Sequence, residues 1–252
     1  QALAAQVVAR LDELAEHDDS GVTWFTPPQF VPPHQLETWP QGYHNLGLAH
    51  GVPAVVGFLA QAAAMGNDRA RQLAEESVGW IISRRLPGGD YSAILEEGPA
   101  PAPARLGWCY GNPGVASALL VAGQVLDRPE WRDVAFDIGR HSAARPDHAA
   151  GVVDPGLCHG AAGLALIYNH LFQASADDTF RDASAHWYER LLDMRRPGVG
   201  IAGYQAWQPP DLIDDPGVLT GAAGVALALH AGSTDVSPMW DAALLMSPAI
   251  SG

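Results

Sequence analysis

The residues best suited to chemistry are two cysteines and a histidine. Cys109 and Cys158 are the only cysteines among the 252 residues, and His159 directly follows the second of them. Each cysteine stands two residues before a glycine that opens an apolar stretch, so both thiols are predicted to lie at helix N-termini. There the helix dipole and the free N–H groups favour the thiolate, which is the form that binds metal.

Two cysteines and one histidine form a zinc ligand set with three protein donors and an open fourth position, the pattern of a catalytic site. We therefore predict that Cys109, Cys158 and His159 bind zinc. The alternative is a pair of buried structural cysteines beside a capping histidine, because a buried thiol behaves as a small apolar group. The zinc interpretation is favoured because both cysteines occupy the same register of an internal repeat.

Four segments share the pattern of this repeat: a small or polar residue, a glycine, two residues, and a Gly or Ala that opens an apolar helix. They are Ala49–Ala60, Cys109–Leu120, Cys158–Asn169 and Leu219–His230. Their first glycines are 60, 49 and 61 residues apart, which suits elaborated helical hairpins better than a regular solenoid. Thr220 is predicted to stand at the cysteine position of the fourth segment, as a helix cap.

Between these segments lie amphipathic stretches with Asp or Asn near their starts, at Asn67–Leu86, Pro129–Ala144 and Asp177–Met194. Their apolar residues recur at helical spacing opposite charged ones, which predicts half-exposed helices. The glycine-opened segments are apolar nearly all round, which predicts helices buried on both sides. The alternation predicts an all-α fold in which inner helices are walled by outer ones, with glycines that let the inner helix ends crowd together.

The remaining segments are predicted to be loop insertions, at residues 20–41 and 87–106. The first contains Phe25–Pro40, which holds five prolines and is therefore not expected to be helical. Tyr91–Leu95 and Ile201–Gln208 are predicted to be short extended insertions.

The composition excludes several classes of protein. Fourteen basic residues against 28 acidic ones give a net charge of −14, and a surface this negative repels phosphate backbones, so no nucleic-acid partner is predicted. Two cysteines cannot form a disulfide framework. No apolar run reaches the roughly 18 residues of a transmembrane helix, so no membrane span is predicted.

The sequences GLAHGVPA, WCYGNPG, GLCHGAAG and LTGAAG resemble the motifs of the lanthipeptide cyclases, the lanthionine synthetase C-like family. The resemblance covers most of the chain from Gly42 onward. It implies an α/α toroid with a central zinc ion, and a substrate peptide whose Ser and Thr residues a separate enzyme has dehydrated. Within the matching motifs, Cys109, Cys158 and His159 correspond to the zinc ligands.

The same resemblance implies roles for three further residues. His50 matches the family's proposed acid/base, while Arg105 and Tyr110 match active-site residues. The alternatives from the residues alone are a core or metal-supporting histidine for His50, a solvated charge for Arg105, and a packing role for Tyr110.

Only part of the implied ring is expected in this chain. The family's ring has about three further hairpins, all upstream, and four repeats cannot close a circle that buries every inner helix. The chain also opens with QALAAQVVARLDELAE, which has the pattern of an amphipathic helix, and an active-site Asp that the family supplies from upstream has no counterpart. We therefore expect residues 1–252 to form a single cyclase domain that lacks an N-terminal portion.

The resemblance implies a zinc-dependent enzyme that adds peptide cysteine thiols to dehydroalanine or dehydrobutyrine, forming (methyl)lanthionine thioether rings. It implies a dehydrated precursor peptide as partner, and a complex with a separate dehydratase and a transporter. It also implies a cytoplasmic protein that reaches the membrane only through such a complex. The alternative is a non-catalytic peptide-binding toroid with a structural zinc. The zinc-dependent protein prenyltransferases are another class of helical toroid, but they lack the CYG and CHG motifs.

Overall fold

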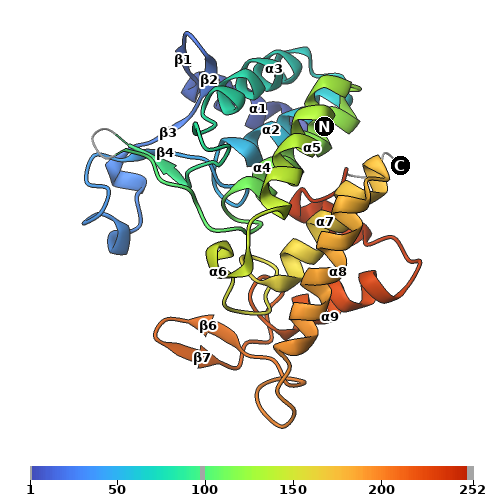
Figure 1. Ribbon diagram of the computed structural model, residues 1–252. Coiled ribbons are helices and arrows are strands. Elements are labelled where there is room, and N and C mark those ends of the chain that lie inside the picture. The colour runs from blue at the N-terminus through green and yellow to red at the C-terminus, as the bar shows by residue number, and fades with distance from the viewer. Residues whose placement is uncertain (1, 97–99, 249–252) are drawn as a thin grey trace.

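The computed structural model describes residues 2–96 and 100–248 (Figure 1). Its main elements are helices arranged in pairs, with short strands confined to the connecting segments. Within the described residues, no helix combines the length and the apolar character needed to cross a membrane.

Four helices form the inner layer, and a glycine is the N-cap residue of each. They are α2 (Val52–Ala64), α4 (Asn112–Val125), α7 (Ala161–Ser175) and α9 (Ala222–Ser233). Their N-cap residues are the four repeat glycines Gly51, Gly111, Gly160 and Gly221. The predicted repeat is therefore confirmed.

Each of the first three inner helices packs against the amphipathic helix that follows it in the chain. The outer helices are α3 (Asp68–Ser83), α5 (Pro129–Ala143) and α8 (Asp178–Asp193), and α1 (Ala2–Leu14) packs beside α2 and α3. Asn67 caps α3 by accepting a hydrogen bond from the Ala70 N–H, at 2.9 Å, and Asp177 caps α8 through the Thr179 N–H. A single turn, α6 (Asp147–Ala150), follows α5.

The inner helices lie side by side in chain order, α2 against α4, α4 against α7, and α7 against α9 (Figure 1). The outer helices cover one side of this row, and α5 also packs against α8. The two curved layers are part of an α/α toroid, which confirms the predicted fold class. Large side chains fill the space between the layers, among them Leu59, Leu119, Tyr168 and Phe180.

Helix α9 departs from the prediction that every inner helix is buried all round. Only Gly224, Val225, Ala228 and Ala231 are buried among its residues, whereas twelve residues of α4 are buried. The reason is position: α4 lies between α2 and α7, while α7 is the principal helical neighbour of α9 among the described elements.

The strands are short. β1 (Glu16–Asp18) and β2 (Gly21–Thr23) form a hairpin, β3 (Phe25–Thr26), β4 (Tyr43–Asn45) and β5 (Ile94–Leu95) form a three-stranded antiparallel sheet, and β6 (Ala206–Gln208) pairs with β7 (Asp211–Ile213). Strands β2, β3, β5 and β6 fall within segments predicted as insertions, whereas β1, β4 and β7 lie outside them. The proline-rich segment has no α-helix, but it makes two 3-10 turns, η1 (Pro28–Phe30) and η2 (Pro33–Gln35), whose prolines stand at the first helical positions.

The C-terminal part of the described chain returns to the inner layer. After α9 it forms the 3-10 helix η3 (Met239–Leu244). The indole Nε1–H of Trp108 donates to the Leu244 carbonyl at 2.8 Å, and the Ser117 hydroxyl donates to the Leu245 carbonyl at 3.2 Å. Because Trp108 directly precedes Cys109, this contact fixes the loop that carries the first cysteine.

Candidate metal centre

The loops before the four inner helices share a seven-residue frame. A glycine stands four residues before each N-cap glycine, and a longer polar residue stands six residues before it. The glycines are Gly47, Gly107, Gly156 and Gly217, and the polar residues are Asn45, Arg105, Asp154 and Asp215. The Oδ1 atoms of Asn45, Asp154 and Asp215 accept the N–H of the glycine two residues on, at 2.8, 3.1 and 2.6 Å. These side chains close the same tight turn in three loops.

This frame corrects the prediction for Thr220. Thr220 directly precedes the N-cap glycine of α9, as His159 directly precedes that of α7. It therefore occupies the histidine position, and Leu219 occupies the cysteine position. Counting back from Gly221 already places Leu219 two residues before the glycine, as Cys158 stands two before Gly160, and the shared turn geometry agrees.

The inner glycines of the frame let each loop lie directly against the next one. A Cβ on Gly47 would lie 2.4 Å from the carbonyl oxygen of Cys109, and one on Gly107 would lie 3.3 Å from the Cα of His159. A Cβ on Gly156 would likewise lie 3.0 Å from the Cα of Thr220. The residues that precede the following inner helix therefore pack directly against each of these glycines.

Backbone hydrogen bonds join the loops at their cysteine positions. The Cys109 N–H donates to the Cys158 carbonyl at 3.0 Å, and the Cys158 N–H donates to the Leu219 carbonyl at 2.7 Å. Equivalent residues of successive repeats are therefore direct neighbours. This pairing brings the two cysteines together although they are far apart in the sequence.

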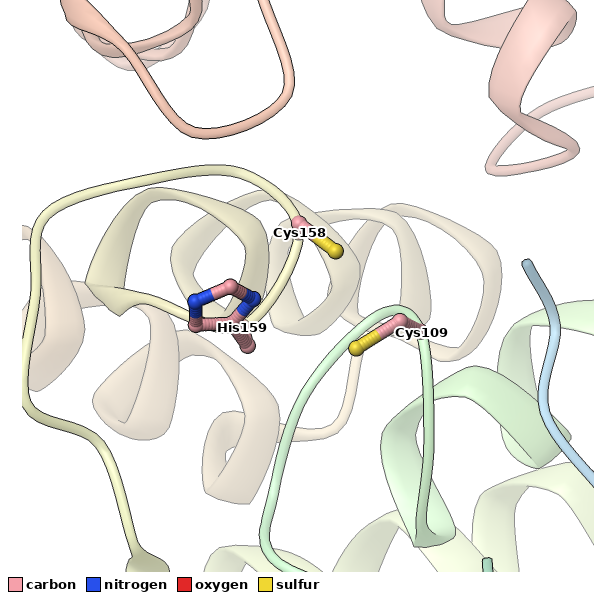
Figure 2. Close-up of side chains that lie close together, drawn as sticks. All are labelled: Cys109, Cys158 and His159. Carbon is pink, nitrogen blue, oxygen red and sulfur yellow. The ribbon is translucent and has the colours of Figure 1, made fainter. Parts of the chain in front are cut away.

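The side chains of Cys109, Cys158 and His159 converge, with one ligand atom from each lying within 4.8 Å of the others. Figure 2 shows the two sulfurs and one ring nitrogen of His159 facing a common space, while the other ring nitrogen points away. Cys109 is buried, and Cys158 and His159 are half-buried. Neither cysteine forms a disulfide. The cluster is therefore partly shielded from solvent.

Asp154 is a residue of this site that the sequence analysis missed. Its side chain is 1% exposed, and its Oδ2 lies 3.2 Å from Nε2 of His159. Because Nε2 contacts Asp154, the nitrogen that faces the sulfurs is Nδ1 (Figure 2). The sequence does hold a signal for Asp154, since the triplet Asp-Pro-Gly precedes both the third and the fourth inner helix.

The protonation states of the three side chains depend on one another. The thiol of Cys158 donates to Cys109, and this hydrogen bond, with those of His159 and the charge of Arg105, lowers the pKa of Cys109 to about 5. The same hydrogen bond and burial raise the pKa of Cys158. Asp154 and then Cys109 accept hydrogen bonds from His159, which raises the pKa of its imidazole to about 9. An incoming metal ion therefore has to displace protons from Cys158 and His159.

The donor set fits a zinc ion. Thiolate sulfur and imidazole nitrogen are the ligands that zinc prefers, and three protein ligands leave one coordination position free. Among residues 2–96 and 100–248, no fourth His, Cys, Asp or Glu ligand atom joins the cluster. A metal ion bound here would therefore have room for an exogenous ligand.

The three other predicted site residues differ in how close they lie to the cluster. Arg105 stands at the polar position of its loop, and its Nη2 lies 4.0 Å from the Cys109 sulfur. Tyr110 is half-buried, its hydroxyl accepts from Asn45 Nδ2 at 3.3 Å, and burial raises its pKa. His50 is exposed and lies outside the cluster, although it directly precedes the N-cap glycine of α2 as His159 precedes that of α7.

Comparisons with known proteins agree with this architecture. The family model of the lanthionine synthetase C-like proteins matches residues 9–245. The chain is 31% identical over 136 residues to "Glutathione S-transferase LANCL1" of Danio rerio, covering 52% of this chain and 31% of that protein. It is 25% identical over 175 residues to "Nisin biosynthesis protein NisC" of Lactococcus lactis subsp. lactis, covering 63% of this chain and 41% of that protein.

A solved structure shares the fold. A nisin cyclase superposes with a TM-score of 0.77 at 22% sequence identity, covering 97% of this chain and 61% of the other. The chain spans less than half the length of the two curated relatives named above.

Proposed function

This chain belongs to the lanthionine synthetase C-like family, and we propose that it carries the zinc centre of a lanthipeptide cyclase. Its substrate is a dehydrated precursor peptide, in which cysteine thiols add to dehydroalanine or dehydrobutyrine to form lanthionine or methyllanthionine rings. The observation that carries this proposal is the convergence of Cys109, Cys158 and His159 from two successive loops. Because only three protein ligands converge, one coordination position would stay free, which favours a site that admits a ligand over a purely structural one.

The proposed reaction is a balanced addition without redox change. The substrate thiol loses its proton, its sulfur bonds to the β-carbon of the dehydroamino acid, and the α-carbon takes up one proton. Zinc held by Cys109, Cys158 and His159 would supply a Lewis acid that favours the thiolate form of the substrate. Two cysteine thiolates and a neutral imidazole balance the charge of a divalent ion, so the substrate sulfur would keep its nucleophilicity.

Arg105 is suited to the charge that develops during the addition. As sulfur attacks, negative charge moves onto the carbonyl oxygen next to the α-carbon. The guanidinium of Arg105 stays protonated throughout, and it lies beside the cluster, with Nη2 4.0 Å from the Cys109 sulfur. A fixed cation near the developing enolate lowers the barrier to its formation.

His50 and Tyr110 are the candidates for the final proton transfer. Both stand directly before an N-cap glycine, as His159 does, in loops that adjoin one another. We assign the proton donor to His50, because imidazole exchanges protons near neutral pH. Tyr110 borders the same loop junction, where Asn45 holds its hydroxyl.

The first test compares two substitutions at the same position of the repeat. Cys109→Ala removes one proposed ligand, whereas Leu219→Ala changes the equivalent residue of the fourth loop, whose side chain is 42% exposed. We expect zinc to fall from one per chain to near zero in Cys109→Ala and to remain stoichiometric in Leu219→Ala. Metal analysis of the protein with its native termini measures this, and a Cys109→Ala protein with full zinc content would contradict the ligand assignment.

Activity is tested with a synthetic peptide that holds one cysteine and one dehydroalanine. Ring formation leaves the mass unchanged and removes the free thiol, so mass spectrometry after thiol labelling reports it. We expect ring formation by the zinc-loaded protein and none by Cys109→Ala. If the zinc-loaded protein binds the peptide and does not close the ring, the non-catalytic alternative replaces the cyclase.

A second candidate function rests on one comparison. The relative from Danio rerio carries the name of a glutathione S-transferase, which favours glutathione as the thiol and an electrophilic compound as its acceptor. The same peptide assay distinguishes the two functions when glutathione is added. A product whose mass has increased by one glutathione supports the second candidate, and a ring of unchanged mass supports the cyclase. The dehydratase and transporter complex remains a prediction.

A further inference from the structure

Asp154 is a buried carboxylate that the proposed reaction does not use directly. Its Oδ1 accepts the Gly156 N–H at 3.1 Å, and its Oδ2 accepts the Trp207 N–H at 3.3 Å. The same Oδ2 lies 3.2 Å from Nε2 of His159, and this is the one ion pair of Asp154 within the described part of the chain. A buried charge without an arginine partner has to be stabilised by such donors.

We propose that Asp154 is a positioning residue that holds the proton of His159 on Nε2 and leaves the Nδ1 lone pair directed at the metal. The tautomer of a metal-binding histidine is set by the hydrogen bond of its other ring nitrogen. Here that partner is a carboxylate oxygen that also accepts the Trp207 N–H, so Nε2–H is the donor that fits it. This inference rests on the proposal that His159 binds zinc.

The arrangement of donors around Asp154 makes this role specific to a carboxylate. Both of its oxygens face donors: Gly156 N–H on one side, and Trp207 N–H with His159 on the other. An asparagine offers only one oxygen. If that oxygen keeps the Gly156 N–H, its NH2 group faces His159 and favours a lone pair on Nε2. The proton then moves to Nδ1, where it opposes metal binding.

The fourth repeat provides a matched position without a metal ligand. Asp215 accepts the Gly217 N–H through Oδ1, at 2.6 Å, and its Oδ2 accepts the Thr220 hydroxyl. It thus makes the same turn and contacts the residue equivalent to His159. If Asp154 only closed its loop, neutralising either aspartate would have a similar effect.

The experiment compares zinc affinity in Asp154→Asn, Asp154→Ser and Asp215→Asn. Asp154→Ser leaves a hydroxyl that can accept the Gly156 N–H but removes the acceptor for His159, so it separates turn closure from histidine orientation. We expect the dissociation constant for zinc, measured by competition with a chromophoric chelator, to rise by about 10–100-fold in both Asp154 variants. For Asp215→Asn, the dissociation constant for zinc should stay within about twofold of the value for the unsubstituted protein. A twofold change is well below a tenfold change, which corresponds to about 1.4 kcal/mol.

Two further measurements separate positioning from folding. Thermal unfolding with chelator present compares the variants without metal and shows that each is folded at the temperature of the zinc titration. The visible spectrum of the cobalt(II)-loaded Asp154→Ser protein should keep its thiolate bands and change in its ligand-field bands, because only the histidine ligand is disturbed. A change confined to the unfolding midpoint would overturn the positioning role.

The possible outcomes distinguish this inference from the proposed function. Normal zinc affinity in both Asp154 variants, beside stoichiometric zinc in the unsubstituted protein, overturns the role of Asp154 alone. Equal weakening in Asp215→Asn also overturns it, because that residue contacts no metal ligand. An unsubstituted protein that binds no zinc overturns both the inference and the zinc centre. If Asp154→Asn does not fold, Asp154→Ser decides the question.

Discussion

Replacing Gly47 by alanine tests how the loops are held together. The added Cβ would lie 2.4 Å from the Cys109 carbonyl oxygen and 2.6 Å from Cε1 of Tyr110. Ordinary contacts begin at about 3.5 Å, so the loop that carries Cys109 has to retreat by roughly 1 Å. The backbone of Gly47 is not in the left-handed region, so the effect is steric. Overpacking of this kind lowers the free energy of unfolding by about 1–3 kcal/mol.

Gly107→Ala is the matched control. Its Cβ would lie 3.3 Å from the His159 Cα and 3.4 Å from the Cys158 carbonyl oxygen, close to ordinary contact. Alanine also reduces the conformational freedom of the unfolded chain, which adds about 0.4–1 kcal/mol of stability. The two effects oppose each other, so we expect a net change near zero for Gly107→Ala.

Urea unfolding and zinc titration of both variants provide the assay. Gly47→Ala should unfold at lower urea with an unchanged slope, which marks a loss of stability without a change in the surface exposed. It should also bind zinc more weakly, because Cys109 is displaced from Cys158. Equal losses of stability in the two glycine variants, or no loss in Gly47→Ala, would refute the steric reasoning.

Two further predictions concern the proton donor and a helix cap. His50→Asn should retain one zinc per chain and slow ring formation by about 10²–10⁴-fold. Metal analysis beside a timed thiol-labelling assay measures both effects. Loss of zinc would make His50 a ligand or a structural element, and an unchanged rate would assign the proton transfer to another group. Asn67→Ala removes the hydrogen bond from the Ala70 N–H at the start of α3 and should lower the free energy of unfolding by about 1 kcal/mol. Zinc binding should be unchanged, as urea unfolding and metal titration would show. A loss above about 2 kcal/mol would exceed what a cap contributes.

Much of the fold follows from local sequence. A glycine before an apolar stretch marks the start of each inner helix. Asn67 and Asp177 mark the starts of two outer helices, because the unpaired N–H groups at a helix start need side-chain acceptors. The amphipathic and all-apolar patterns distinguish the two layers, because each helix buries its apolar surface. The short strands were predictable only as extended insertions, since their pairing depends on distant segments.

The sequence also limits the metal ligands, because Cys109 and Cys158 are the only cysteines in the chain. It does not determine which loops meet. The tertiary structure decides that by packing Gly47 and Gly107 against the following loops and by pairing the backbones of Cys109 and Cys158.

Residue roles that depend on orientation are likewise decided by the tertiary structure. Asp154 lies five residues before His159, and only the folded turn aims its carboxylate at Nε2. His50 occupies the repeat position of His159 but is exposed, whereas His159 is half-buried and paired with Asp154. Local sequence sets helix starts and donor types through short-range hydrogen bonds and burial, whereas the direction of a side chain depends on neighbours from other repeats.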